Sequence, residues 1–428
     1  MSDGPLRSGE PGIRPILLLS ATLLAVACRD SALGPGATRL PRALTASEQQ
    51  LIAADNAFAF KLYQAMASGE TPDANIFISP LSVGMALGMT VNGAAGATRD
   101  SMLAALQLGV LPMDQVNRSY RSVIDLLRGL DPGVAFTLAN SIWYRTNFGT
   151  PGQAFLDDTH TYFDARIQAL DFSAPTAAKT INGWVSEQTQ GKIPEIVADP
   201  IDPAVVMYLI NAIYFKGSWA QRFDSTLTSN GPFTLRTGAT VTAATMTYRV
   251  AAPARLYQGD GVRVVDLAYG GGAYAMTIVL PESGAIDSLS AGLTGARWNT
   301  WIAGLDSQKV YVTMPKFRLT LDRELESPLA ALGMGNAFCD RGGGVFSRMY
   351  PGSLPGQFCI TEVKHKTYVD VYEEGTEAAA VTSVGVGVVC ARCDAPQFVV
   401  DRPFIVAIRE RLTGTILFLG RVMNPTAS

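Results

Sequence analysis

The sequence predicts one large α+β domain that follows an export signal. Helical and strand patterns alternate along the chain, and neither an internal repeat nor a linker interrupts them after residue 48. Of the 428 residues, 48% are hydrophobic and 17% are charged, which suits a large buried core and excludes a disordered chain. The length alone would favour several domains, so the uninterrupted pattern is the observation that favours one. The net charge of −3 argues against a nucleic-acid partner.

Residues 1–27 are predicted to be a signal peptide. Arg7 and Arg14 precede a short apolar run, which cannot span a bilayer as a helix but suits the hydrophobic region of a signal peptide. The run ends in small residues followed by Cys28, a pattern typical of bacterial lipoproteins, in which that cysteine carries the lipid. Plain secretion is the alternative. In both cases the chain is exported, either anchored in the cell envelope or extracellular, and residues 28–46 are a flexible tether rich in Pro, Gly, Ser and Ala.

Export changes how the five cysteines are interpreted. If one carries lipid, an even set of four remains, which predicts disulfides in an oxidising compartment. We favour the pairs Cys339–Cys359 and Cys390–Cys393, although the sequence alone leaves the connectivity open. The second pair is also a bare C-x-x-C motif. No second such motif and no nearby histidine complete a zinc set, so no metal site is predicted.

Local patterns predict several elements. Thr45 and Glu48 form a capping box at the start of an amphipathic helix. A second helix is predicted over residues 176–196, with its end near Gly191. The almost continuous apolar run over residues 205–215 predicts a strand that is buried on both faces. Two hairpins are predicted, over residues 262–268 with 274–280 and over residues 404–409 with 415–422.

The sequence predicts no enzymatic activity. It contains only two histidines and lacks both the G-x-S-x-G and the H-E-x-x-H motifs. A Ser-His-Asp triad would therefore need one of these two histidines. His160 lies in a polar, surface-like stretch, and His365 lies between two lysines before an alternating strand pattern. The glycine triplets lack the lysine of a phosphate-binding loop, so we expect no cofactor.

An uncharged segment near the C-terminus differs from ordinary surface loops, which are polar and contain Pro and Gly. Residues 378–391 carry no charge, and no proline occurs between Glu373 and Ala395. At the period of a strand, one face carries only small and β-branched residues. That face consists of Thr376, Ala378, Ala380, Thr382, Val384, Val386 and Val388. The charged stretch 373–377 predicts a flexible, exposed hinge before this segment, and a plain core strand is the alternative.

Several long motifs, in order, resemble the serpin family over about residues 47–425. The resemblance implies the serpin fold for a domain at residues 47–428: α+β, with three β-sheets, eight or nine helices and an exposed reactive loop. The matching motifs are NIFISPLS at 75–82, TQGKI at 189–193, NAIYFKGSW at 211–219, EEGTEAAA at 373–380, FVVDRPF at 398–404 and GRVMNP at 420–425.

The resemblance implies an inhibitor that is cleaved by its target protease. The protease forms an acyl-enzyme with the loop, and the cleaved loop inserts into the central sheet and carries the protease with it. The expected partner is an elastase-like or trypsin-like serine protease, with a cysteine protease as a further option. The expected state is a monomer that contacts a membrane only through a lipid anchor. A non-inhibitory, serpin-like binding protein is the alternative function.

The resemblance also assigns roles to individual residues. Trp219 matches the breach, where insertion begins, and Lys316 matches the ionic partner of Glu373. The residues that match the shutter, where the sheet opens, are Ser79, Ser82, Asn211 and His365. The residues that match the hinge are Glu373, Glu374, Gly375, Thr376, Glu377, Ala378, Ala379 and Ala380.

Two ways of counting place the scissile bond differently. Counting forward from Glu373 places it at Val389–Cys390, which suits an elastase-like protease and is our preferred position. Counting back from Pro403 places it at Arg392–Cys393, which suits a trypsin-like protease. A disulfide between the two cysteines would tether both ends after cleavage at the second position, so inhibition through arginine would then require reduction.

Overall fold

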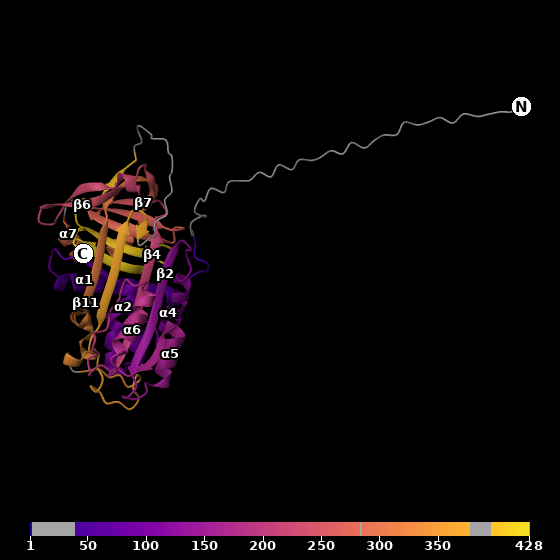
Figure 1. The fold of residues 1–428 in the computed structure, drawn as a ribbon, viewed down its shortest axis with the longest axis vertical. Helices are drawn as coiled ribbons and strands as arrows, with labels where there is room; N and C mark the ends of the chain where they lie inside the picture. Colours follow the sequence, from indigo (N-terminus) through magenta and orange to yellow (C-terminus); the bar gives the residue numbers. More distant parts are fainter. Residues whose placement is uncertain (2–38, 283–284, 342, 377–394, 428) are drawn as a thin grey trace. The chain divides into compact units, whose positions relative to one another are not determined.

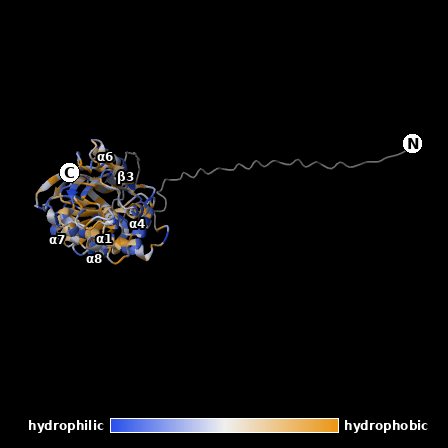
Figure 2. Cartoon of the chain, turned by 90° about the horizontal axis from the view of Figure 1, so that it is seen from below, coloured by the Kyte–Doolittle hydropathy of each residue, from blue (hydrophilic) through white to orange (hydrophobic). Residues whose placement is uncertain are grey.

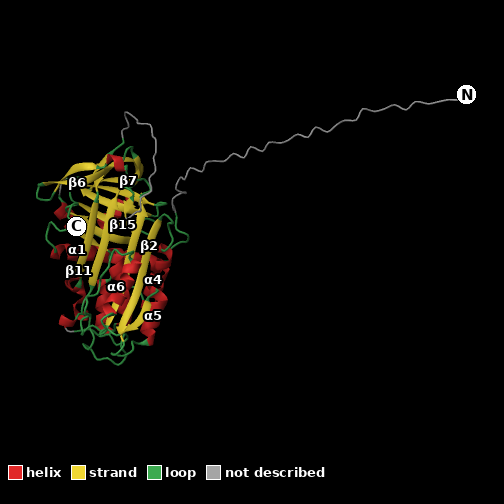
Figure 3. Ribbon diagram, viewed as in Figure 1, coloured by secondary structure: helices red, strands yellow, loops and turns green. Residues whose placement is uncertain are grey.

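The central layer of the fold is a six-stranded sheet whose strands come from distant parts of the sequence (Figures 1 and 3). The structure, a computed structural model, describes Met1 and residues 39–282, 285–341, 343–376 and 395–427. The strands of this central sheet, in spatial order, are β11 (Phe317–Glu324), β12 (Lys364–Tyr372), β13 (Gly375–Thr376), β4 (Met207–Ser218), β2 (Val134–Arg145) and β3 (Arg166–Leu170).

Two further sheets share the long strand β10 (Asp306–Pro315). The first half of β10 pairs with β7, and its last residues, from Thr313, pair with β6. This arrangement confirms the expected α+β fold with three sheets. The second sheet contains β1 (Ile76–Ile78), β16 (Ile416–Val422), β15 (Phe404–Glu410), β9 (Tyr274–Pro281), β8 (Val262–Tyr269), β7 (Ala252–Gly259) and β10. The third contains β10, β6 (Thr240–Thr247), β5 (Ser229–Thr234) and β14 (Gln397–Val399).

Helices cover the sheets, and those drawn in Figure 2 carry both hydrophobic and hydrophilic residues, as expected for helices that cover a core on one side. Helix α1 begins with the predicted capping box, in which the backbone N–H of Glu48 donates to Thr45 Oγ1 at 3.2 Å. The described residues contain nine α-helices: α1 (Ala46–Gly69), α2 (Pro80–Gly93), α3 (Gly96–Ala105), α4 (Met113–Leu127), α5 (Gln153–Phe163), α6 (Ala177–Gln188), α7 (Ile286–Ala291), α8 (Gly295–Ala303) and α9 (Glu326–Leu329).

Strand β4 is buried on both faces, as its apolar run predicted. Side chains alternate across a strand, so adjacent residues of β4 belong to different clusters. Ile213 and Phe215 belong to the main core with α2, whereas Ile210 and Ala212 pack in a smaller cluster with α6. The central sheet is therefore covered by apolar side chains on both sides at this point.

The other local predictions are confirmed, with small shifts of boundary. Helix α6 ends at Gln188, and Gly191 follows it with a φ of 78°, a conformation that glycine adopts readily. Strands β8 and β9 form the first predicted hairpin, and β15 and β16 form the second. The pair Cys339–Cys359 is confirmed as a disulfide with an S–S distance of 2.05 Å.

The prediction that the loop is flexible and exposed from Glu373 onward is wrong for its first residues. Gly375 and Thr376 form strand β13 inside the central sheet, and Thr376 is 2% exposed. Glu373 is also buried. The physical reason is that the chain turns after β12 and finds hydrogen-bond partners on both neighbouring strands, which compensate for the burial of its backbone.

Asp55 of α1 is a buried carboxyl group whose surroundings favour its neutral, protonated form. Its Oδ1 accepts a hydrogen bond of 3.0 Å from the hydroxyl of Tyr120 on α4. Burial raises the pKa of Asp55 to about 7, and the hydrogen bond from Tyr120 opposes that rise only in part. The pKa of an unfolded aspartate lies near 3.9. The unfolded chain therefore loses this proton at lower pH than the folded chain, and the group destabilises the fold as pH rises.

We predict that Asp55→Asn stabilises the protein increasingly as pH rises, because asparagine keeps the acceptor for Tyr120 without a charge. From pH 5 to pH 8 the advantage of the variant should grow by about 2–3 kcal/mol. Urea unfolding of both proteins at the two pH values measures this difference. A gap between variant and wild type that is the same at both pH values would contradict the prediction.

Candidate functional site: the hinge and the seam of the central sheet

The described residues of the hinge lie between one end of β12 and one end of β4. The chain leaves β12 at Tyr372, turns through Glu373 and Glu374, and runs back as β13. Thr376 pairs with Val371 of β12 on one side and with Gly217 of β4 on the other. Among the described strands, β12 and β4 are joined only through β13.

Glycine is required where β13 approaches β4. A Cβ atom added to Gly375 would lie 2.1 Å from the backbone oxygen of Gly217, a distance no side chain tolerates. A Cβ atom added to Gly217 would lie 2.8 Å from the ring of Tyr269. The two glycines therefore allow the strand and the aromatic ring to pack against each other with nothing between them.

Trp219, the predicted breach residue, forms two hydrogen bonds with the turn between β12 and β13. Its indole Nε1 donates to the carbonyl of Tyr372 at 2.8 Å, and its backbone N–H donates to the carbonyl of Glu374 at 2.9 Å. Its ring stacks on that of Tyr269, with the centroids 4.4 Å apart and the planes at 11°. The hydroxyl of Tyr269 in turn forms a buried hydrogen bond with the hydroxyl of Thr376.

Glu373 is held by Lys316, as the resemblance implied, and by a second partner. Lys316 Nζ donates to its two carboxylate oxygens at 2.9 and 3.1 Å, and Thr228 Oγ1 donates to Oε1 at 2.7 Å. Burial would raise the pKa of Glu373. The hydrogen bonds from Thr228 and Lys316 outweigh that effect and keep the pKa below its usual range. These hydrogen bonds hold Glu373, the first residue of the hinge, in place beside the sheet.

Farther along β4 and toward the start of β12 lies a cavity of about 160 Å³, which we call the seam. One wall is residues 207–213 of β4, and the other is the segment 358–366, which leads into β12. Helix α6 contributes Val185 to the lining. The shutter residues Ser82, Asn211 and His365 also line the seam.

The shutter residues form a buried hydrogen-bonded group behind the seam. The backbone N–H of Ser79 donates to Nε2 of His365 at 2.9 Å, and Ser79 Oγ donates to the carbonyl of Leu417 at 2.8 Å. Ser82 Oγ donates to the carbonyl of Asn211 at 3.4 Å. The group therefore links β12, through His365, to α2 and to β4 across the opening.

Three residues of this site were missed by sequence reasoning: Tyr269, Thr228 and Asn140. Asn140 of β2 accepts a hydrogen bond of 2.8 Å from Asn211 Nδ2. Each of the three lies in an ordinary strand or loop pattern, and no local signal distinguishes it. Only their positions beside the hinge and the shutter reveal a role.

The remaining predicted site residues lie outside the described residues. These are Cys28, the hinge residues Glu377, Ala378, Ala379 and Ala380, and the two candidate scissile bonds Val389–Cys390 and Arg392–Cys393. Within the described ranges, no group of three or more potential metal ligands occurs. A search of the same ranges found no helix with the length and apolarity that a membrane crossing requires.

Comparisons with known proteins agree on one family. A sequence model of that family, described as Serpin (serine protease inhibitor), matches residues 53–425. The leukocyte elastase inhibitor of Sus scrofa is 34% identical over 387 residues, which cover 88% of this chain and 100% of the relative. Native tengpin, a thermophilic serpin, has a TM-score of 0.79 at 28% identity and covers 90% of this chain and 95% of its own. Human thyroxine-binding globulin complexed with thyroxine also has a TM-score of 0.79 at 28% identity, with 89% and 100% covered.

The fold, in which β13 lies between β12 and β4, therefore agrees with the class of protein that these comparisons identify. The chain belongs to the serpin family of serine protease inhibitors, and it is an inhibitor rather than an enzyme.

Acid should weaken the shutter, because burial lowers the pKa of His365 to about 4. Below pH 6.5 the unfolded chain binds a proton that the folded chain does not accept until about pH 4. The stability contributed by neutral His365 is therefore lost as pH falls through that window. We predict a loss of about 2 kcal/mol between pH 7 and pH 5 from this residue.

The comparison of His365→Gln with wild type at both pH values measures this loss, because glutamine offers an acceptor to Ser79 but does not titrate. His160→Gln is the matched control, since His160 lies exposed at the end of α5. An acid-induced loss that is equal in wild type and His365→Gln would contradict the prediction.

Proposed function

We propose that this chain inhibits a serine protease by offering residues 373–392 as a substrate and then inserting the cleaved segment into the central sheet. One observation supports the proposal: Gly375 and Thr376, the last described residues before the loop, form a strand between β4 and β12. Its residues pair with both β4 and β12, and the seam is lined by the two strands that an inserted strand would join. A longer β13 would follow the same path.

Two energetic contributions favour this step. About a dozen further residues would form a similar number of ladder hydrogen bonds, each contributing roughly 1 kcal/mol net. Their inward valines and threonines would leave water at roughly 25 cal/mol per Å² of buried apolar surface. Both contributions favour insertion, and they oppose the conformational entropy that the segment loses on becoming a strand, roughly 1–2 kcal/mol per residue.

For the target, we propose an elastase-like protease that cleaves between Val389 and Cys390. The spacing from Glu373 supports this bond, and a leukocyte elastase inhibitor is among the relatives. Arg392–Cys393, with a trypsin-like protease, is the second candidate. We further propose an exported bacterial lipoprotein, anchored through Cys28 and acting as a monomer, with residues 47–428 as the inhibitory domain. The pattern that ends at Cys28 supports this placement.

The deciding experiment incubates the mature protein with an elastase-like and a trypsin-like protease. We expect an SDS-stable complex with the elastase-like enzyme and a released C-terminal peptide that begins at Cys390, identified by mass spectrometry. A peptide that begins at Cys393 would assign the second bond. Cleavage without any complex would contradict inhibition and support the non-inhibitory alternative.

We predict that Thr376→Arg converts the inhibitor into a substrate. Thr376 is buried between β12 and β4 against Tyr269, and burying an unpaired charge there costs ~3 kcal/mol or more. The yield of complex per cleavage should fall about 100-fold. Thr376→Val is the matched control, because it keeps the shape of the side chain and loses only the hydroxyl. Wild-type yields of complex from Thr376→Arg would show that insertion does not pass this position.

A further inference from the structure

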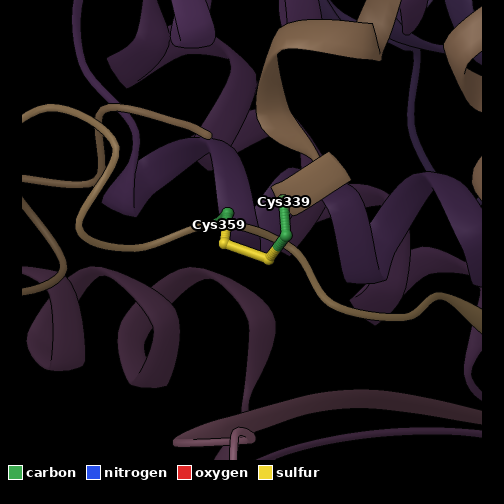
Figure 4. Close-up of a disulfide and its surroundings, with 2 residues drawn as sticks. All are labelled: Cys339 and Cys359. Atoms are coloured by element: carbon green, nitrogen blue, oxygen red, sulfur yellow. A yellow bond between two sulfur atoms is a disulfide. The ribbon is translucent and has the colours of Figure 1, made fainter. Parts of the chain in front are cut away.

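The disulfide Cys339–Cys359 lies at the lower end of the wall that β12 contributes to the seam. Cys359 lines the seam and precedes the first residue of β12, Lys364, by a few positions. Figure 4 shows its disulfide with Cys339. Cys339 is exposed, in the short helix Cys339–Arg341. One sulfur of the bond thus belongs to a solvent-accessible residue, and the other belongs to the functional site.

The disulfide crosses a junction that is also held by backbone hydrogen bonds. The N–H of Cys339 donates to the carbonyl of Ile360 at 3.2 Å, and the N–H of Ile360 donates to the carbonyl of Ala337 at 2.8 Å. These are weak individual contributions, each roughly 1 kcal/mol net. The covalent bond is what makes this junction permanent.

Residues that precede and follow Cys339 in the chain form hydrogen bonds with helix α3. Ser101 Oγ donates to Asn336 Oδ1 at 2.6 Å, and the N–H of Val345 donates to Thr98 Oγ1 at 2.9 Å. A connection therefore runs from α3 through residues 336–339 and the disulfide to the segment that precedes β12. The described residues of the opposite wall, β4, carry no disulfide.

A strand that enters the seam must separate its walls, since neighbouring strands lie about 4.8 Å apart. With the disulfide closed, the base of β12 cannot yield, and only the β4 side can move. With the disulfide open, both walls can move, and the barrier that keeps the uncleaved loop out of the seam becomes lower. The loop begins this step from β13, which already pairs with both walls.

We infer that Cys339–Cys359 is a thiol–disulfide exchange site whose closed form keeps the inhibitor in its active, uninserted state. The reactant is a dithiol. One of its thiolates attacks a sulfur of the disulfide and displaces the other cysteine as a thiolate. The second thiol then resolves the mixed disulfide. Two electrons and two protons pass to the protein, which gains two cysteine thiols, and the dithiol becomes a disulfide. Reduction leads to insertion of the uncleaved loop and loss of inhibition. The inference rests on the proposed inhibitory function.

The test follows SDS-stable complex formation over time for wild type and for Cys339→Ser/Cys359→Ser, each with and without dithiothreitol. We expect oxidised wild type to keep its activity. Reduced wild type should lose it about tenfold faster or more, a factor that corresponds to ~1.4 kcal/mol of barrier, while the chain stays uncleaved and its melting temperature rises. The double variant should lose activity at the faster rate in both conditions.

The double variant also controls for the other cysteines, because any effect of dithiothreitol on them would remain in it. If wild type loses activity at the same rate with and without dithiothreitol, the inference is overturned. It is also overturned if the lost activity comes with a lower melting temperature, since that outcome means unfolding rather than insertion. Should the double variant fail to fold, Cys390→Ser/Cys393→Ser takes its place, and an equal rate of loss with and without dithiothreitol in that variant overturns the inference. If oxidised wild type forms no complex with any protease, the proposed function itself fails, and this result is separate from the redox comparison.

Discussion

The rest of the structure depends on the strand pairing of Gly375 and Thr376 between β12 and β4. One edge of β4 is paired with β2 over almost its whole length, from Met207 to Gly217. On the other edge, among the described strands, only Gly217 and Ser218 have a strand partner. An unpaired strand edge is normally covered or blunted because it invites pairing with another strand. Here residues 207–213 of this strand line a cavity, and the chain itself supplies the first residues of a strand beside β4.

The closed state of the seam is held by several modest contacts rather than by one strong contact. Lys316 is partly exposed, so its ion pair with Glu373 is weakened by solvent. The bond between Ser79 and His365 depends on a histidine that stays neutral only because it is buried. Contacts of this size can be lost one after another as a strand advances. No single step then has to break a large interaction, which suits a protein that must rearrange quickly after cleavage.

The sequence predicted the architecture well, because the information it needed was local. Period-two and capping patterns lie within a few residues of each other, and the predicted helix start, buried strand and hairpins were therefore found. The family motifs then supplied the order of the elements. The one structural error, the exposure of Glu373 and Thr376, arose from partners that are far away in sequence. Thr228 lies 145 residues from Glu373, and Tyr269 lies 107 residues from Thr376.

The same distance explains why parts of the site were missed. Tyr269 is the last residue of β8, and the sequence pattern of this strand predicts only an ordinary core residue there. Its value to the hinge comes from Gly217, which removes the side chain that would otherwise separate the ring from β13. Likewise, the four cysteines that remain when Cys28 is set aside favoured a disulfide but did not indicate its position at the base of β12. Such roles are properties of the fold and not of any segment.

The composition of the loop now has a physical account. Ile213 of β4 faces the main core, and Ile210 faces the cluster with α6, so a strand beside β4 would meet apolar side chains on both faces. The hydroxyl of Thr376 meets Tyr269, which places the even-numbered face toward the core. A charge on either face would then be buried without a partner. Residues 378–391 carry none, and the last charge before them in the sequence is Glu377. The absence of charge is thus what a strand position covered on both sides requires.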